Sequence, residues 1–379
     1  MKIAFFDDRF FEVYGAQENV LILAELAQRA GHDSLFITTS NGPLQEEAER
    51  RGIPTRVVPA PARLKMFERG ATKGGPLRIA RSFTDLVTYG PQLHAVLIEE
   101  DIEIVLAGAV RASLMLWRTR AAQSPKVVLF AQNSTPFGVF SLASLPGLEV
   151  LAPISSGALT TFPAWSKRLW PKQMPLHSGR QLSWYSVDRD DEDTNELRIV
   201  SVGALIERKG FHVLLDAIAG LQESGVKVHT RIIGGTSGPD SEIYAASLRQ
   251  TVAEKSLDVE FTGWQDDVRN ELAWANVFVL ASSNEGLPGV ILEAMASGLP
   301  VVATDAGGCK DVVDDEVGAL VPIGDAARLQ SALATLTIPE LRNQRGARAA
   351  ERVQLEYSLD AFYQRFEDVV NLIASAQVQ

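Results

Sequence analysis

Short apolar runs rich in β-branched residues alternate with longer segments of helical periodicity along most of the chain. Runs that are apolar on both faces are typical of strands in a parallel sheet that helices cover on both sides. Their alternation with helical patterns predicts repeated βαβ units and a doubly wound α/β architecture. The strands are expected at Lys2–Phe6, Ser34–Thr38, Thr55–Val58, Ile102–Ala107, Val127–Ala131, Val150–Ile154, Arg198–Val202, Val228–Ile233, Val259–Thr262, Val277–Ala281, Val301–Thr304 and Ala319–Val321.

The rhythm of strands and helices stops between Trp165 and Leu197. Prolines and a glycine break up this stretch, and residues 188–193 form an acidic run, as is typical of a linker. We therefore predict two domains, each of which binds ligands at the carboxyl ends of its strands, where loops gather. The predicted boundaries are 1–170 for the N-terminal domain, 171–197 for the linker and 198–357 for the C-terminal domain.

The length and composition support this division. The chain has 379 residues, which at roughly 150 residues per domain favours two domains. With 46% hydrophobic and 22% charged residues, the composition is that of a globular protein and excludes wholesale disorder. No apolar run approaches the roughly 18 to 20 residues that span a bilayer, and two aspartates interrupt the apolar N-terminus too early for a signal peptide.

Charge and metal-binding residues narrow the range of functions further. A formal net charge of −11 at pH 7 argues against a nucleic-acid partner. Cys309 is the only cysteine, which excludes disulfide scaffolds and cysteine-based zinc sites, and the five histidines lack the paired spacing of a metal site. We therefore expect a protein of the reducing cytoplasm without a metal centre.

The segment 281–308 carries the densest chemical pattern. A predicted strand ends at its start, and a helix is expected to begin near Pro288 and to end at Gly298. The amide groups and the positive dipole end of such a helix start suit a phosphate. Glu285 and Glu293 lie on either side of this helix start, and two carboxylates suit the hydroxyls of ribose or a hexose. The alternative is a solvated glutamate pair on a helix that only packs.

A second phosphate-binding pattern lies at 202–211. A predicted strand runs into Gly203, and a helix is expected to begin after Gly210. Arg208 and Lys209 would place positive charge beside this helix start, as a clamp for a diphosphate. The alternative is a basic corner of the surface. The presence of Glu285 and Glu293 in the same domain favours the clamp.

These residues resemble a known enzyme family. Glu285 and Glu293, separated by seven residues and followed by Pro300-Val301-Val302 and Gly307-Gly308, are similar to the signature of the retaining glycosyltransferases with the GT-B fold, family 4. The resemblance covers most of the chain and is densest from about 199 to 325. Further motifs in the family's order are Gly203…Gly210, Ile233-Gly234-Gly235, Phe261-Thr262-Gly263, Gly318–Val321 and, near the N-terminus, Tyr14-Gly15-Ala16-Gln17 and Leu26…Ala30-Gly31-His32.

The resemblance implies a fold and a division of labour. Two Rossmann-like domains would face a central cleft, and the last helix, at about 358–379, would pack back onto the N-terminal domain. The C-terminal domain would bind a nucleotide-diphosphate sugar, and the N-terminal domain would shape the acceptor site. UDP-sugars are favoured over GDP-sugars as donors, and no further cofactor is expected.

The resemblance also implies roles for individual residues. Glu293 would hold the ribose hydroxyls, and Glu285 would contact the donor sugar near its transferring carbon. Lys209, with Arg208, would neutralise the diphosphate leaving group. The remaining donor-binding residues would act through small size or backbone amides, and they are Gly15, Ala16, Gly203, Gly234, Gly263, Gly286, Leu287, Pro288, Gly289 and Val290.

Transfer with retention and without a metal ion follows from the same resemblance. Departure of the nucleoside diphosphate leaves an oxocarbenium-like sugar, so cations that are preorganised on the phosphates stabilise the transition state directly. No Asp-x-Asp metal pair is evident at a strand end. The adjacent pairs Asp7-Asp8, Asp266-Asp267 and Asp314-Asp315 have diverging side chains and are expected to be surface or capping residues.

The chain departs from the family at several functional positions, one of which is the Gly15-Ala16 turn, where a glycine pair is commoner. Ala204 stands where many members carry an arginine, and Arg208 is expected to replace it. Asn133, a further catalytic candidate, stands in the loop where many members carry a histidine. Its amide would bond to the donor sugar or the acceptor, and the alternative is a turn-forming asparagine after a strand.

Two other regions are open to a functional or a structural interpretation. Residues 61–83 combine six basic residues and several apolar ones with the single acid Glu68. This mixture suits an anionic membrane surface or an acidic acceptor, and the alternative is a solvated loop with part of a core helix. The second region is a cluster of tryptophans and basic residues near the predicted linker. It is either a platform on which the acceptor binds or a part of the linker that packs onto the surfaces of the domains. It comprises Trp165, Trp170, Trp184, Lys167, Arg168 and Lys172.

We therefore predict a hexosyltransferase for surface polysaccharide, glycolipid or a glycosylated metabolite, in the cytoplasm or at the inner face of the membrane. One alternative is a nucleotide-sugar epimerase of the same fold, which needs no acceptor. Another is a non-catalytic nucleotide-sugar-binding subunit of an assembly complex. A dehydrogenase is disfavoured, because no Gly-x-Gly-x-x-Gly follows the first predicted strand.

Overall fold

The computed structural model describes residues 1–8, 13, 15–61, 64, 75–132, 139–187 and 195–376. The chain divides into two compact units. The N-terminal unit comprises Met1–His177 and Phe362–Gln379, and the C-terminal unit comprises Ser178–Ala361. Residues 171–197, expected to form the linker, are thus shared between the units.

Among the described residues of the N-terminal unit, seven strands form a parallel sheet in the order β3-β2-β1-β4-β5-β6-β7. The direction of winding reverses between β1 and β4, and ligands of such folds bind where this reversal occurs. The strands are β1 Lys2–Asp7, β2 Asp33–Thr38, β3 Thr55–Val57, β4 Ile104–Ala107, β5 Lys126–Ala131, β6 Val150–Pro153 and β7 Lys172–Gln173.

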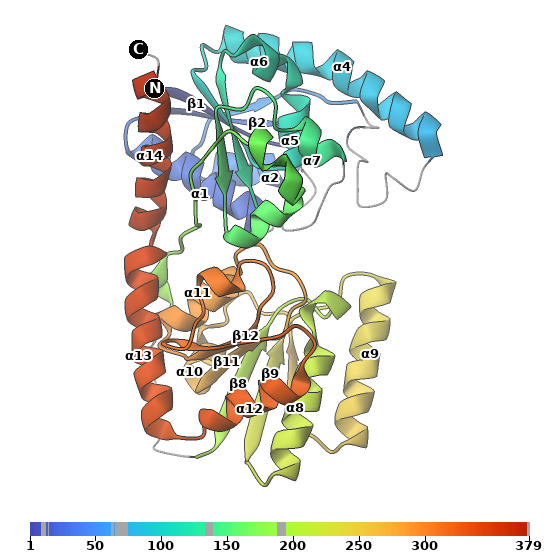
Figure 1. Ribbon diagram of the computed structural model, residues 1–379, viewed down its shortest axis with the longest axis vertical. Helices are drawn as coiled ribbons and strands as arrows, with labels where there is room; N and C mark the ends of the chain where they lie inside the picture. The colour runs from blue at the N-terminus through green and yellow to red at the C-terminus, as the bar shows by residue number, and fades with distance from the viewer. Residues whose placement is uncertain are drawn as a thin grey trace. The chain divides into compact units, whose positions relative to one another are not determined.

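Helices cover both faces of this sheet (Figure 1). Phe6 lies in an apolar cluster with Leu93 of α4, on one face. On the other face, the ring of Phe5 lies 5.8 Å from that of Phe366 in α14. The helices are α1 Gly15–Arg29, α2 Pro43–Arg50, α4 Gly75–Glu99, α5 Val110–Met115, α6 Trp117–Ala122, α7 Val139–Ala143, the 3₁₀ turns η2 Ser156–Thr161 and η3 Ala164–Leu169, and α14 Leu359–Ala376.

In the part of the C-terminal unit that the structure describes, six strands form a second parallel sheet, in the order β10-β9-β8-β11-β12-β13. The winding reverses here between β8 and β11, which are neighbours in the sheet. The strands are β8 Leu197–Val202, β9 Val228–Ile233, β10 Val259–Gly263, β11 Val277–Leu280, β12 Val301–Thr304 and β13 Gly318–Val321.

The helices of the C-terminal unit also lie on both sides of their sheet (Figure 1). Helix α8 packs beside α9 and α12, whereas α11 packs beside α13. No helix among the described residues of either unit is long and apolar enough to cross a membrane. The elements are η4 Leu182–Trp184, η5 Glu207–Lys209, α8 Phe211–Glu223, α9 Pro239–Glu254, α10 Arg269–Trp274, α11 Gly289–Ala296, η6 Cys309–Asp311, α12 Ala326–Thr335 and α13 Pro339–Glu356.

The predicted fold class is confirmed. Each of the twelve predicted strands is present, with ends shifted by at most two residues. The reason is visible in strands such as β4, β11 and β12, which are buried at every residue and so have no polar face. Strand β7 was not predicted, because two residues between Pro171 and Pro175 are too few to show a pattern.

Candidate active site

The loops that follow β8 and β11 meet at the point where the winding of the C-terminal sheet reverses. After β8 the chain turns through Gly203 into η5, which carries Arg208 and Lys209, and then into α8. After β11 a loop carries Glu285 toward α11. Because the two strands pair directly, the predicted basic clamp and the first predicted acid are brought together.

Glu285 is the centre of this cluster. Its Oε1 accepts hydrogen bonds from Lys209 Nζ and Ser282 Oγ, each at 2.7 Å, and Arg208 Nη1 lies 3.4 Å away. The carboxylate is only 10% exposed. Burial favours a higher pKa for Glu285, but the charges of Lys209 and Arg208 and the two hydrogen bonds outweigh it and hold the pKa below its ordinary value. Glu285 is therefore a buried carboxylate that stays ionised.

Backbone contacts lock the two loops together. The carbonyl of Arg208 accepts a hydrogen bond from the Ser283 amide at 2.8 Å, and the Arg208 guanidinium donates to the carbonyl of Asn284. Gly210 has a left-handed φ of +66°, and a Cβ there would lie 2.0 Å from the carbonyl oxygen of Ala281. Only glycine lets α8 begin so close to the end of β11.

The predicted glycines at neighbouring strand ends also come together. The Gly203 amide donates to the carbonyl of Ile233, and the Gly234 amide donates to the carbonyl of Gly263, both at 2.9 Å. A Cβ on Gly203 would lie 3.1 Å from Cε of Lys209, so the lysine chain crosses this glycine. Gly203, Gly234 and Gly263 therefore share the edge of the sheet with Lys209.

Glu293 is held by different partners. Its Oε1 lies 3.9 Å from Arg180 Nε, and the Tyr185 hydroxyl donates a hydrogen bond to it. The carboxylate is 17% exposed. Burial raises the pKa of Glu293, and Arg180 and Tyr185 offset this only in part. Burial and the Glu293 charge in turn raise the pKa of Tyr185 to about 12.

The sequence did not predict Arg180 and Tyr185 as site residues. Both lie in the stretch expected to be a linker, where no periodicity marks a buried side chain. The Arg180 amide donates to the carbonyl of Tyr357 at 2.9 Å, and Ser297 Oγ of the α11 end donates to the carbonyl of Tyr185 at 2.8 Å. These long-range bonds fix the segment against α11, and nothing local in the sequence indicates them.

The other predicted donor-binding residues of this unit lie at the start of α11. Gly286, Leu287 and Pro288 form the loop before the helix, and Gly289 and Val290 form its first turn. The Leu287 side chain is buried, so only its backbone is available to a ligand. A Cβ on Gly289 would lie 2.5 Å from Nη2 of Arg180, which places the guanidinium beside the helix start.

In the N-terminal unit, Gly15 and Ala16 begin α1, beyond the end of β1. The carbonyl of Ala16 accepts a hydrogen bond from Gln132 Nε2 at 3.0 Å, so the predicted small-residue turn is tied to the end of β5. Asn133 lies outside the described residues, and so do the basic side chains of 61–83.

The expectation that Asp7 and Asp8 are surface or capping residues is wrong. Both are buried, because β1 lies between β2 and β4 and its end is covered. Gln17 Nε2 donates to Asp7 at 3.4 Å, and Asp8 forms an ion pair with Arg111. The expectation was correct for the other two pairs, Asp266-Asp267 and Asp314-Asp315, which are exposed. The carboxylates of Asp267 and Asp314 also accept hydrogen bonds from nearby backbone amides.

Comparison with known proteins supports the resemblance. Residues 196–337 match the family described as glycosyl transferases group 1. The lipopolysaccharide core biosynthesis glycosyltransferase LpsE of Rhizobium meliloti is 35% identical over 182 residues, which cover 46% of this chain and 51% of that protein. The phosphatidyl-myo-inositol mannosyltransferase of Mycobacterium leprae is 26% identical over 385 residues, 96% of each chain.

Several curated relatives are matched over only part of their length. The putative colanic acid biosynthesis glycosyltransferase WcaL of Escherichia coli is 38% identical over 152 residues, 37% of this chain and 36% of that protein. The chain thus spans about half of LpsE and about a third of WcaL.

Solved structures extend the similarity of fold to both units. HepE of Anabaena, in complex with UDP and glucose, has a TM-score of 0.74 and 18% identity, covering 98% of this chain and 99% of that chain. The sucrose-phosphate synthase of Thermosynechococcus elongatus has a TM-score of 0.75 and 19% identity, covering 99% of each. The chain therefore has the GT-B fold, and its residues 196–337 are similar to the group 1 glycosyltransferases.

Proposed function

We propose that this protein is a retaining glycosyltransferase that moves a hexosyl group from a nucleotide-diphosphate sugar to a hydroxyl acceptor. The observation that carries the proposal is the cluster of Lys209, Arg208 and Glu285 at the winding reversal of the C-terminal sheet. It combines two cations with an ionised acid at an edge where such sheets bind ligands.

In the proposed reaction, Lys209 and Arg208 bind the diphosphate and stabilise the charge that develops on it as the sugar departs. These cations supply the positive charge on the leaving group, so no metal ion is needed for that purpose. Glu285, kept ionised by the same cations, faces the positive charge that develops on the sugar ring. Its bonds to Lys209 and Ser282 suit this electrostatic role better than nucleophilic attack, which supports attack of the acceptor from the leaving-group side.

Glu293 binds the ribose hydroxyls in this proposal. An ionised carboxylate accepts two hydroxyl hydrogen bonds, and charge-assisted bonds are the stronger kind. Arg180 and Tyr185 hold the carboxylate in place. We propose UDP as the preferred nucleotide, which agrees with the UDP in the HepE complex.

We propose a sugar hydroxyl of a surface polysaccharide or glycolipid as the acceptor, in agreement with the names of LpsE and WcaL. The reaction is proposed to take place in the cytoplasm.

Product analysis tests this function. The purified chain is incubated with UDP- and GDP-hexoses, with and without lipopolysaccharide or glycolipid acceptors, and the products are examined by NMR. The proposal expects nucleoside diphosphate release that depends on the acceptor, and a new bond with the anomeric configuration of the donor. A changed donor sugar without acceptor would show an epimerase instead. Tight binding without any release would show a non-catalytic subunit.

The substitution Glu293→Gln is expected to weaken nucleotide binding at neutral pH by roughly 10- to 100-fold, since a hydrogen bond to a charged group contributes about 1.5–3 kcal/mol. Binding by the unaltered protein should weaken as the pH falls through the raised pKa of Glu293, because the carboxylate becomes protonated. Binding by the Gln variant should vary less over the same range. Calorimetric titration across pH measures both effects.

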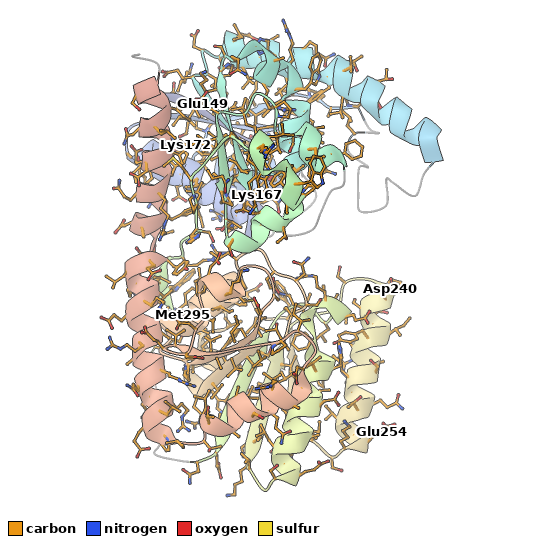
Figure 2. The ribbon with its side chains drawn as sticks, in the orientation of Figure 1. Glu149, Lys167, Lys172, Asp240, Glu254 and Met295 are labelled. Atoms are coloured by element: carbon orange, nitrogen blue, oxygen red, sulfur yellow. The ribbon has the colours of Figure 1, made fainter. Side chains whose placement is uncertain are left out.

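A matched control is Glu254→Gln, on the exposed side of α9 (Figure 2). Its affinity and its pH profile should equal those of the unaltered protein. Equal affinity of the Glu293 variant and the control would remove Glu293 from the site.

A further inference from the structure

The 3₁₀ turn η3 of the N-terminal unit exposes two large apolar side chains. Trp165 is 71% exposed and Leu169 is 60% exposed. Packing onto domain surfaces, one of the two interpretations of the tryptophan cluster, is therefore wrong for Trp165. It holds for Trp170, whose ring meets that of Phe162 edge-on at a centroid distance of 5.8 Å.

The turn beneath these side chains is well anchored. Ser166 is fully buried, and its Oγ donates to the carbonyl of Pro163 at 2.6 Å. Trp170 Nε1 donates to the same Oγ at 2.8 Å. The Phe162 ring, which Trp170 contacts, belongs to the core of the unit. The backbone of η3 is thus fixed from below, while Trp165 and Leu169 contribute little to the fold.

The chain around this turn has an unusual charge. Residues 150–187 contain four Lys and Arg residues and no Asp or Glu, whereas the whole chain has 47 acids and 36 bases. Lys167, Arg168 and Lys172 are exposed, and their side chains form no ion pair with any residue that the structure describes. Figure 2 shows Lys167 and Lys172 on the N-terminal unit.

We propose that this face docks onto an anionic phospholipid surface. The docking face is defined as Trp165, Lys167, Arg168, Leu169 and Lys172. Tryptophan and leucine side chains enter the boundary between headgroups and acyl chains, and neighbouring cations bind anionic headgroups. Stable yet reversible attachment of a peripheral protein requires both kinds of contact, and this face carries both. The face lies apart in sequence from residues 61–83.

Charge complementarity selects this partner. A neutral apolar partner would leave three unpaired cations beside the contact, and a polyanion without an apolar phase would leave Trp165 and Leu169 in water. An anionic lipid surface satisfies both halves of the docking face. The inference stands independently of the proposed sugar transfer, because none of these residues belongs to the C-terminal unit.

Co-sedimentation of the full chain with liposomes tests the inference. Vesicles of phosphatidylcholine alone are compared with vesicles that also contain phosphatidylglycerol, at low and high salt. We expect binding only to the anionic vesicles, weakened by salt. Lys167→Gln with Arg168→Gln should reduce the affinity by roughly fivefold for each charge removed. Trp165→Ser should reduce it by roughly tenfold or more.

Controls of equal exposure lie on the C-terminal unit. Ile243→Ser on α9, where Ile243 is 70% exposed, and Lys227→Gln should leave vesicle binding unchanged. Quenching of tryptophan fluorescence by brominated acyl chains gives a second measurement, and Trp165→Phe should remove most of that quenching. Absence of binding to anionic vesicles would overturn the inference. So would equal binding by the Trp165, Lys167 and Arg168 variants, which would place the contact elsewhere, as in 61–83.

Discussion

Replacing Lys209 with methionine is expected to lower the turnover number by roughly 10²- to 10³-fold, the range seen when one preorganised charge-stabilising group is removed from an active site. Methionine keeps the carbon chain that crosses Gly203 and removes only the charge. The loss should fall mainly on turnover, because the lysine acts most strongly on the charge that develops as the diphosphate departs. Steady-state kinetics with a saturating donor measures the effect.

A structural side effect of this substitution must be measured separately. Lys209 lowers the pKa of Glu285, so this carboxylate contributes stability above its unfolded pKa, which is lost as the pH falls through the lowered pKa of the folded state. Without Lys209, that contribution at neutral pH should shrink, and the free energy of unfolding reports it. Lys227→Met, at an exposed ion pair with Glu196, is the matched control. Unchanged turnover in a folded Lys209→Met variant would contradict the proposed role.

Replacing Gly210 with alanine is expected to abolish nucleotide binding and to lower the free energy of unfolding by about 3 kcal/mol or more. The left-handed φ of +66° costs a non-glycine residue roughly 1–2 kcal/mol by itself. In addition, the new Cβ would lie 2.0 Å from the carbonyl oxygen of Ala281, so the loop that carries Glu285 must move away from Lys209. Denaturant unfolding and calorimetric titration measure the two effects.

Gly225→Ala separates the clash from the backbone strain. Gly225 also has a left-handed φ, of +81°, but a Cβ there would meet nothing within 4 Å. This control should therefore lose only the strain energy of roughly 1–2 kcal/mol and keep its nucleotide affinity. Similar losses in both variants would mean that the contact between Gly210 and Ala281 does not hold the site together.

The fold was predictable because its main signal is local. Strands such as β11 are apolar on both faces, and such runs occur in few settings other than a sheet covered by helices. The meeting of Lys209 and Glu285 was also predictable, since both follow strands of one domain and parallel strands end at one edge. The general rule that loops of a doubly wound sheet gather at the carboxyl ends of its strands was therefore enough to predict this contact.

The contacts that the sequence did not predict depend on long-range packing. Arg180 meets Glu293 across more than a hundred positions, from a stretch without periodicity. Asp7 and Asp8 were expected at the surface because the side chains of adjacent residues diverge. Their burial follows from the central place of β1 in its sheet, and the strand order is a property of the whole unit.

Calorimetric titration with nucleoside diphosphates tests the central claim most directly. The unaltered protein should bind UDP, or GDP in its place, at one site per chain. The affinity should fall in Lys209→Met and in Glu293→Gln, while Lys227→Met and Glu254→Gln bind as the unaltered protein does. If no nucleoside diphosphate binds, or if the two site variants bind it as tightly as their controls, then the edge between β8 and β11 is not a donor site and the account is wrong.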